Sequence, residues 1–272
     1  MKPVAKYFVE TKLESSHVDF RRELRMIQAF MWFQDIAAAH ADNLGAGVTK
    51  LVTERNVAWV IMRMRVEVDR MPLLDEEITI GTWPQATGPL YERDYDIVSR
   101  AKDGESLIRA ASVWIIMDLE TRDIVKNFLV DYHEIDPLRD RALGIKLRQL
   151  KAPDGLTPVS EKRISYSDLD YNGHINNTKY LDYIYDCFDI SYHEKYRVSA
   201  VEIDYINEGH HGETIIMYMT DMTAKPAAAN VPASLREGEG GLADAPVKYI
   251  EGRSSMDDRT VFKAKIEFTR RD

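Results

Sequence analysis

Residues 168–186, DLDYNGHINNTKYLDYIYD, join a polar turn to the start of an amphipathic segment. The dipeptide Asn172-Gly173 is typical of tight turns, because both residues accept backbone conformations that most others avoid. From about Asn177 to Tyr192, apolar residues recur at the spacing of one helix face, which predicts a helix. Asparagine at 176 or 177 is a suitable N-cap for it. The stretch therefore predicts a turn that leads directly into a helix.

Strand-like segments surround this helix in the second half of the chain. Residues 163–170, RISYSDLD, precede it and are strand-like. Alternating or β-branched runs then predict strands at 198–208, 213–222, 247–256 and 260–270. Residues 223–246 are rich in Ala, Gly, Pro and Glu, a composition that predicts a flexible insertion.

The first half has the same order of elements. Apolar spacing predicts a helix from Arg21 to Leu44, with Gly45 as its stop. Strands are predicted at 57–68, 76–84, 91–100 and 106–119, with a turn at 102–105 before the last of them. Residues 134–157 carry Pro and Gly interruptions, and we interpret them as a connector with some helix.

The predicted elements follow the order helix, strands, connector, helix, strands. This order raises the possibility of an internal repeat. Displacing the chain by 151 residues places Asp19 on Asp170 and Phe33 on Ile184. Past the helix, a displacement of 137 places Pro72 on Gly209. Residue identity between the halves is low, so the repeat is one of element order and apolar pattern.

Composition narrows the class of protein. A chain of 272 residues that is 44% hydrophobic can form one large domain or two smaller ones. The net charge of −9 argues against binding to nucleic acid or to a membrane surface. No apolar run is long enough to cross a bilayer, and the charged N-terminus is unlike a signal peptide. The single cysteine, Cys187, cannot form an intrachain disulfide, which fits a reducing compartment. The chain is therefore expected to be cytoplasmic.

The turn also carries residues that suit catalysis. In an extended segment Asp170, Asn172 and His174 alternate, so their side chains would share one face. The helix start beyond them would offer free backbone N–H groups to an oxyanion. Glu208 ends the strand predicted at 198–208 and could enter the same cleft. The alternative is structural, with the acid and amides holding a turn and Glu208 solvated at a strand end.

At this point the chain resembles a known family, the acyl-[acyl carrier protein] thioesterases that end fatty-acid synthesis in plants and bacteria. Their motif reads D-L-D-x-N-x-H-x-N-N-x-x-Y. This chain supplies every named position of it: Asp168, Leu169, Asp170, Asn172, His174, Asn176, Asn177 and Tyr180. WVIMRMRVEVDRMP, ITIGTWP and RDYDI are similar to the family's first half, and DYINEGHHGE is similar to the segment that bears its second acid.

The resemblance implies an α+β fold, a tandem of two hotdog units in which an antiparallel sheet wraps a long helix. The expected organisation is an N-terminal hotdog at 1–133, a connector at 134–157 and a catalytic C-terminal hotdog at 158–272. Asp19, Arg21 and Glu23 stand opposite Asp170, Asn172 and His174, and Met71 stands opposite Glu208. The first unit is therefore expected to have a degenerate site and to supply the acyl-chain pocket.

The implied reaction is hydrolysis of a fatty acyl thioester by water. Asp170 or Glu208 would take the proton, Asn172 would position the water or thioester, and His174 would protonate the thiolate. The oxyanion would lie in the region of Asn176 and Asn177. Plant members often carry a cysteine directly after the second acid. Here that residue is Gly209, which disfavours a thiol acyl-enzyme.

Other functions remain open from the sequence. They are an acyl-CoA thioesterase, a non-catalytic acyl-binding or carrier-binding protein, and a dehydratase on the same fold. No cofactor and no metal are expected, because nucleotide-binding and paired-His motifs do not occur. The expected partner is acyl carrier protein, and the chain is expected to be a monomeric pseudo-dimer or a homodimer. Candidate basic contacts for that acidic partner are Arg21, Arg22, Arg25, Lys146, Arg148, Lys151, Lys162 and Arg163.

Overall fold

The computed structural model describes residues 2–85, 90–101, 104–125, 138–222 and 245–271. The chain divides into two compact units, Met1–Gln149 and Leu150–Asp272. Each unit is described below by itself. Among the described residues, no helix combines the length and apolar character needed to span a membrane.

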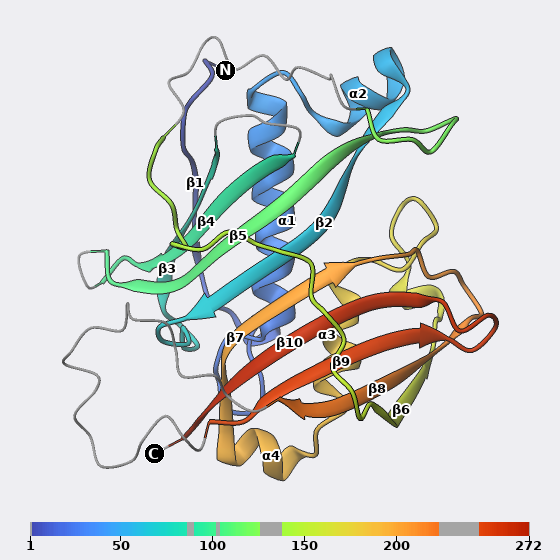
Figure 1. Ribbon diagram of the computed structural model, residues 1–272. Coiled ribbons are helices and arrows are strands. Elements are labelled where there is room, and N and C mark those ends of the chain that lie inside the picture. Colours follow the sequence, from blue (N-terminus) through green and yellow to red (C-terminus); the bar gives the residue numbers. More distant parts are fainter. Residues whose placement is uncertain (1, 86–89, 102–103, 126–137, 223–244, 272) are drawn as a thin grey trace. The chain divides into compact units, whose positions relative to one another are not determined.

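Unit 1 contains an antiparallel sheet with strand order β1-β3-β4-β5-β2 (Figure 1). Four of its strands confirm the predictions to within about a residue at each end. The fifth, β1, was missed because most of its residues are exposed at the sheet edge, so it has no apolar alternation. The strands are β1 (Tyr7–Lys12), β2 (Val57–Val68), β3 (Glu77–Pro84), β4 (Tyr91–Ser99) and β5 (Ser106–Asp118).

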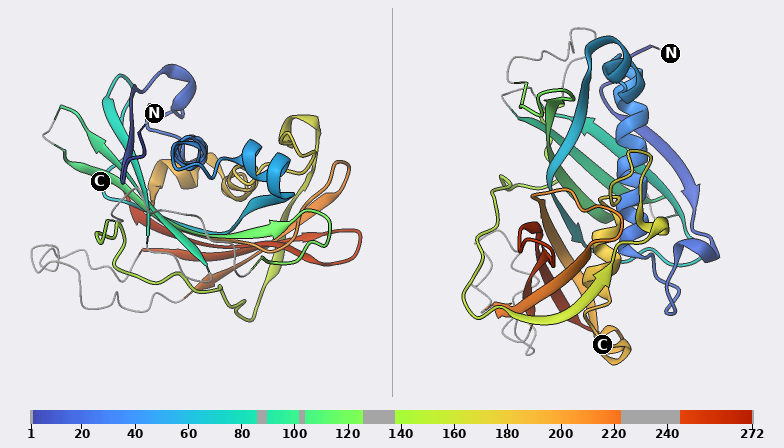
Figure 2. Two further views of the ribbon diagram at one scale, coloured as in Figure 1. Left: turned by 90° about the horizontal axis from the view of Figure 1, so that it is seen from above. Right: turned by 90° about the vertical axis from the view of Figure 1, so that its right-hand side faces the viewer.

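The long helix α1 (Met26–Asn43) lies against one face of this sheet, as its end-on view in the left panel of Figure 2 shows. Phe33 on its buried face packs against Tyr95 of β4, with 4.9 Å between ring centroids. His40 is fully buried in the same face, where its Nε2 lies 2.8 Å from the Val4 carbonyl. The predicted start at Arg21 is wrong, because a turn at residues 19–22 and β-bridges at Glu23 and Leu24 precede the helix. A second helix, α2 (Val48–Arg55), was not predicted.

Unit 2 contains an antiparallel sheet with strand order β6-β8-β9-β10-β7. The four later strands confirm the predictions, although β7 ends before Glu208. The strand predicted at 163–170 is wrong, because β6 ends at Arg163 and a 3-10 turn, η2 (Tyr166–Asp168), follows. The strands are β6 (Thr157–Arg163), β7 (Tyr196–Tyr205), β8 (Thr214–Met222), β9 (Val247–Ser254) and β10 (Thr260–Arg270).

The helix predicted from Asn177 to Tyr192 is broken in two, α3 (Lys179–Tyr185) and α4 (Ile190–Lys195). The Tyr185 carbonyl accepts the Phe188 N–H at 3.1 Å and lies 3.1 Å from His193 Nε2, so it does not continue the helical ladder. Residues 186–189 then turn the chain, and Phe188 packs on Phe268 of β10. Ring packing on the sheet thus overrides the local helical spacing.

The connector contains no helix in its described part, residues 138–156, so that expectation is wrong there. Leu143 and Leu147 are buried instead against Ala111 and Val113 of β5. Residues 102–103 of the predicted turn and residues 223–244 of the predicted insertion lie outside the described residues.

Corresponding hydrogen bonds confirm the internal repeat. The 3-10 turn η1 (Ser15–His17) corresponds to η2 at the displacement of 151. After each, a β-bridge joins the two displaced segments, Glu23 with Leu73 and His174 with His210. The strand orders also match, since β1 to β5 correspond in turn to β6 to β10. The sequence displacements of 151 and 137 therefore describe one folding pattern used twice, an α+β unit in tandem.

Candidate active site

The motif segment forms a tight turn rather than an extended face. Asp170 Oδ1 accepts the backbone N–H groups of Asn172 at 2.8 Å and His174 at 3.3 Å. The Asp170 N–H donates to the His174 carbonyl at 2.8 Å, and Gly173 has a φ of 79°. The expectation that this segment is extended is therefore wrong. The aspartate side chain binds its own backbone, a known alternative to an extended strand.

The second acid comes from a loop and not from a strand end as predicted. Strand β7 stops at Tyr205, and the N–H groups of Ile206 and Asn207 both donate to the Val261 carbonyl, at 2.9 and 3.1 Å. The Gly209 carbonyl then accepts the Ile175 N–H at 3.1 Å. These bonds lay the loop that carries Glu208 alongside the residues that follow the turn.

His174 and Glu208 meet at this junction. His174 Nδ1 lies 3.6 Å from Glu208 Oε1, and the two side chains are 31% and 38% exposed. The ring of His210 packs edge-on against His174, with 5.1 Å between centroids. Asn172 Nδ2 donates to Asp170 Oδ2 at 3.4 Å. The predicted residues thus form two contacting pairs, one within the turn and one between the turn and the loop. Both acidic members, Asp170 and Glu208, are partly exposed to solvent.

Asn176 holds a turn directly before helix α3. Asn176 Oδ1 accepts the Thr178 N–H at 2.9 Å and the Thr178 hydroxyl at 2.8 Å, and the Asn176 carbonyl accepts the Lys179 N–H. The N-cap of α3 is Thr178, which makes no side-chain cap hydrogen bond, so the prediction that Asn176 or Asn177 is the N-cap is wrong. Within the described part of the chain, the half-buried Asn177 has an N–H with no acceptor.

Tyr180, the last residue of the motif, braces the loop from inside the core. It is 2% exposed, its ring packs against Phe262 at 4.9 Å, and its phenol oxygen hydrogen-bonds the Gly209 backbone. Burial raises its pKa, so the phenol stays neutral. A Cβ added at Gly209 would lie 2.8 Å from Ile164 Cδ1, closer than side chains normally approach. The position is therefore tightly enclosed by the core.

The chain's cysteine is unsuited to nucleophilic attack. Burial raises the pKa of Cys187 to about 12, and its Sγ donates to the Tyr183 carbonyl at 3.3 Å. A thiol with such a pKa is almost entirely protonated near neutral pH.

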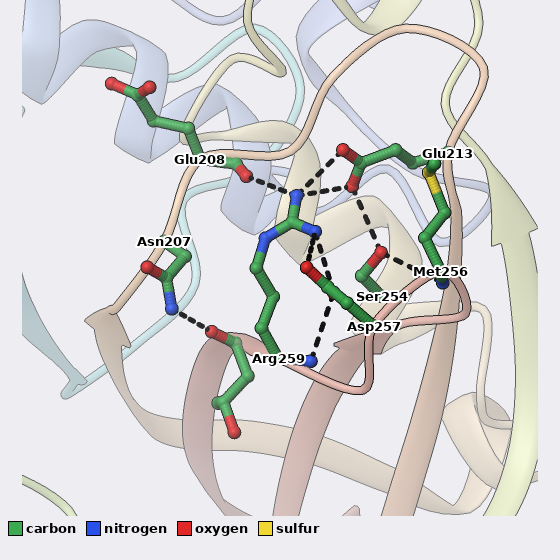
Figure 3. Close-up of polar contacts among 8 residues, drawn as sticks. Asn207, Glu208, Glu213, Ser254, Met256, Asp257 and Arg259 are labelled. Atoms are coloured by element: carbon green, nitrogen blue, oxygen red, sulfur yellow. Dashed lines mark hydrogen bonds and ion pairs between the residues drawn. The ribbon is translucent and has the colours of Figure 1, made fainter.

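Two residues that the sequence did not identify, Arg259 and Glu213, lie directly beside the loop that carries Glu208 (Figure 3). Arg259 Nη2 donates to the Glu208 carbonyl at 3.2 Å and to both Glu213 carboxylate oxygens at 2.7 Å. Arg259 stands 51 residues after Glu208 in the chain, so no local motif links the two. In the described ranges, no group of three or more His, Cys, Asp or Glu side chains could hold a metal ion.

Comparison with known proteins assigns the family. The acyl-ACP thioesterase N-terminal domain matches residues 5–132, and the acyl-ACP thioesterase C-terminal domain matches residues 156–244. The chain belongs to the acyl-ACP thioesterase family. The resemblance found in the sequence is thereby confirmed for both halves of this family member.

Two relatives illustrate the sequence similarity. A chloroplastic palmitoyl-acyl carrier protein thioesterase of Gossypium hirsutum is 34% identical over 176 residues, 60% of this chain and 41% of that protein. A chloroplastic dodecanoyl-[acyl-carrier-protein] hydrolase of Cinnamomum camphora is 28% identical over 207 residues, 72% of this chain and 54% of that protein. The match thus spans about half of the length of these curated relatives.

Solved structures of the acyl-ACP thioesterase family share the fold over the whole chain. One from Bacteroides thetaiotaomicron is 25% identical with a TM-score of 0.79, covering 97% of this chain and 98% of that one. The 12:0-ACP thioesterase of Umbellularia californica, 21% identical, has a TM-score of 0.77 and covers 98% of this chain and 95% of that one. The predicted α+β tandem hotdog fold is confirmed.

Proposed function

We propose that this chain hydrolyses fatty acyl thioesters of acyl carrier protein and releases the free fatty acid. The observation that carries the proposal is the pairing of His174 Nδ1 with Glu208 Oε1 at 3.6 Å, in the segments that precede helix α3 and follow strand β7. Family membership supports the substrate class, as do relatives named for palmitoyl and dodecanoyl carrier-protein thioesters. The site lies in a loop and turn where a thioester can approach from solvent.

Of the two acids that the sequence left as candidates for the base, Glu208 fits better. Asp170 Oδ1 already accepts two backbone N–H groups that close its turn. In unit 1, Asp19 Oδ1 accepts the same pair, from Arg21 at 2.8 Å and Glu23 at 3.1 Å. That turn carries no histidine, so an aspartate here holds the turn without any catalytic partner. We therefore assign Asp170 to positioning and Glu208 to proton transfer.

The proposed reaction begins when the Glu208 carboxylate takes a proton from water. The water oxygen attacks the thioester carbonyl carbon, and the N–H of Asn177, in the turn that Asn176 holds, stabilises the resulting oxyanion. The carbon–sulfur bond then breaks to give the free acid, and His174 protonates the departing thiolate with the proton that Glu208 passes to it. That step is undemanding because a thiol has a pKa of about 8.5. Asn172 orients the water or the thioester from the turn.

The division of labour between the units is also part of the proposal. Residues 158–272 would be catalytic and residues 134–157 would connect them to an N-terminal hotdog, 1–133, that holds the acyl chain. Support comes from the degenerate positions Arg21, Glu23 and Met71, which lack histidine and the second acid. In unit 1, the partly buried Trp59 of strand β2 packs against a buried apolar cluster, a surface suited to a hydrocarbon chain.

Basic side chains could meet the acidic carrier. Arg21, Arg22 and Arg25 are exposed in unit 1, near its first turn. Elsewhere in the chain, Lys146, Arg148, Lys151 and Arg163 are also exposed. Lys162 already pairs with Asp186 at 2.8 Å and is the weakest candidate of the set.

We propose that the chain works in the cytoplasm as a monomeric pseudo-dimer. Light scattering would distinguish this state from the alternative homodimer.

The test is a panel of C8–C18 acyl thioesters on carrier protein. It is assayed with the wild type and with Asp170→Ala, His174→Ala and Glu208→Ala. We expect fatty acid release by the wild type and losses of about 10²–10⁴-fold in kcat when Glu208 or His174 is removed. Equal background rates in all four proteins would instead support a non-catalytic binding protein. A much higher kcat/KM on matched acyl-CoA esters would reassign the carrier.

A further inference from the structure

Arg259 joins the second acid of the site to a buried carboxylate (Figure 3). Its Nη2 donates to the Glu208 carbonyl at 3.2 Å and to Glu213, while Nη1 donates to both Asp257 oxygens at 2.8 and 2.9 Å. Figure 3 shows the Glu208 carboxylate pointing away from this guanidinium. Arg259 therefore acts on the backbone of residue 208 and leaves its carboxylate to face His174.

We propose that Arg259 is a positioning residue that fixes Glu208 for proton transfer, with Glu213 as its anchor. The proposal rests on the proposed thioesterase function, because it assigns a role within that reaction. Its physical basis is that a general base must be held close to its productive geometry. A misplacement of about 1 Å can cost on the order of 10²-fold in rate.

The anchor itself is firmly held. Glu213 is 7% exposed and accepts the Ser254 hydroxyl at 3.3 Å in addition to the guanidinium. The hairpin between β9 and β10 sets the direction of Arg259, since the Ser254 N–H donates to the Arg259 carbonyl at 3.0 Å. A buried carboxylate requires a charged partner, so this ion pair cannot be relaxed without cost. Arg259 is thus a rigid support and not a freely moving surface side chain.

Residues on both sides of Glu208 are tied to other elements. Asn207 Nδ2 donates to the Thr260 carbonyl at 2.7 Å, and the Gly209 carbonyl accepts the Ile175 N–H at 3.1 Å. Those contacts set the path of the loop. The Arg259 contact acts at residue 208 itself and fixes the orientation of its peptide plane, from which the side chain projects.

Unit 1 contains a counterpart with no catalytic residue to hold. Arg70 Nη1 donates to the Met71 carbonyl at 3.3 Å, and Arg70 also binds Glu76 and Glu105 at 2.7 and 2.9 Å. Met71 and Glu76 correspond to Glu208 and Glu213 at the displacement of 137. The guanidinium comes from a different position, yet it holds the same carbonyl. Arg70 is therefore a matched control for the purely structural part of this interaction.

A double-mutant cycle separates positioning from general support. Arg259→Met should lower kcat on an acyl carrier-protein thioester by about 10–100-fold, with KM changed less than about 2-fold. In a Glu208→Gln background the same change should cost less than about 2-fold, because the residue it positions no longer takes the proton. Arg70→Met should lower the melting temperature but leave kcat within about 2-fold. Arg259→Lys, which keeps a cation beside Glu213, should recover part of the rate.

Several results would overturn the assignment. If Arg259→Met costs the same factor with and without Glu208, or if Arg70→Met lowers kcat as far, the role is structural only. If Arg259→Met does not fold, the cycle is run with Arg259→Met/Glu213→Gln, which removes both charges of the pair. A wild type that releases no fatty acid refutes the thioesterase function itself. An active wild type with an unchanged Arg259→Met refutes only the positioning role.

Discussion

Replacing a carboxylate by its amide should have different consequences at the two acids of the site, Asp170 and Glu208. Asn at 170 can still accept the N–H groups of Asn172 and His174 with its Oδ1, so Asp170→Asn should preserve the turn. Gln at 208 keeps the shape of the side chain but cannot take a proton. The pair of substitutions therefore separates holding a turn from acting as a base.

The magnitudes follow from the contacts. Loss of a general base lowers kcat by about 10²–10⁴-fold, which we expect for Glu208→Gln. For Asp170→Asn we expect less than about 10-fold, since the loss is one of charge near the site and not of the base. Asp170→Ala removes two hydrogen bonds of a half-exposed turn, which should cost about 1–2 kcal/mol in the free energy of unfolding. Asp19→Ala removes the equivalent pair in unit 1 and should cost a similar amount.

The assay measures kcat from fatty acid release at saturating acyl carrier-protein thioester, and stability from urea unfolding of the same proteins. Asp19→Asn and Asp19→Ala serve as controls, because they alter the same turn where no histidine follows. The reasoning is refuted if Asp170→Asn loses as much rate as Glu208→Gln with an unchanged unfolding midpoint. That result would make the Asp170 carboxylate the base and its turn bonds incidental.

Three further predictions concern groups away from the proposed proton transfer. Burial and the nearby Arg93 charge lower the pKa of His40 from 6.5 to about 4. Between these two pH values the unfolded chain binds a proton at His40 and the folded chain does not. Stability should therefore fall by about 2 kcal/mol between pH 7 and pH 5, and His40→Gln should lack this slope in urea titrations. Cys187→Ser should keep kcat within about 2-fold, and iodoacetamide should label the native thiol far more slowly than the unfolded one; inactivation in step with labelling would contradict this. Gly252→Ala should cost about 1–3 kcal/mol in unfolding experiments, because its Cβ would overlap the Phe262 ring.

Local pattern was enough to predict most of the fold. Strands such as β2 alternate apolar and polar residues or are continuously apolar, and their bounds follow from that alone. Elements without an apolar signature were missed, as in the exposed edge strand β1. The break between α3 and α4 was also missed, because it depends on Phe188 packing against Phe268, a contact between residues far apart in the sequence.

For the site, the sequence supplied the identities and the structure supplied the roles. The spacing of Asp170, Asn172 and His174 was read as an extended face, but the aspartate side chain captures two N–H groups and closes a turn. A side chain that binds its own backbone cannot be recognised from alternation alone. Arg259 could not be found, because its contact with Glu208 depends on how the β9–β10 hairpin returns to the loop.

The internal repeat separates what the fold requires from what the chemistry requires. Both units have the aspartate-held turn, the bridge to the following loop and a guanidinium on the carbonyl that corresponds to residue 208. These features cannot by themselves be catalytic, since unit 1 has them together with Glu23 and Met71. What differs is histidine at 174 and glutamate at 208, whose side chains meet at 3.6 Å. The catalytic proposal therefore depends on that pair, while the shared scaffold explains why two residues from distant segments are held close enough to cooperate.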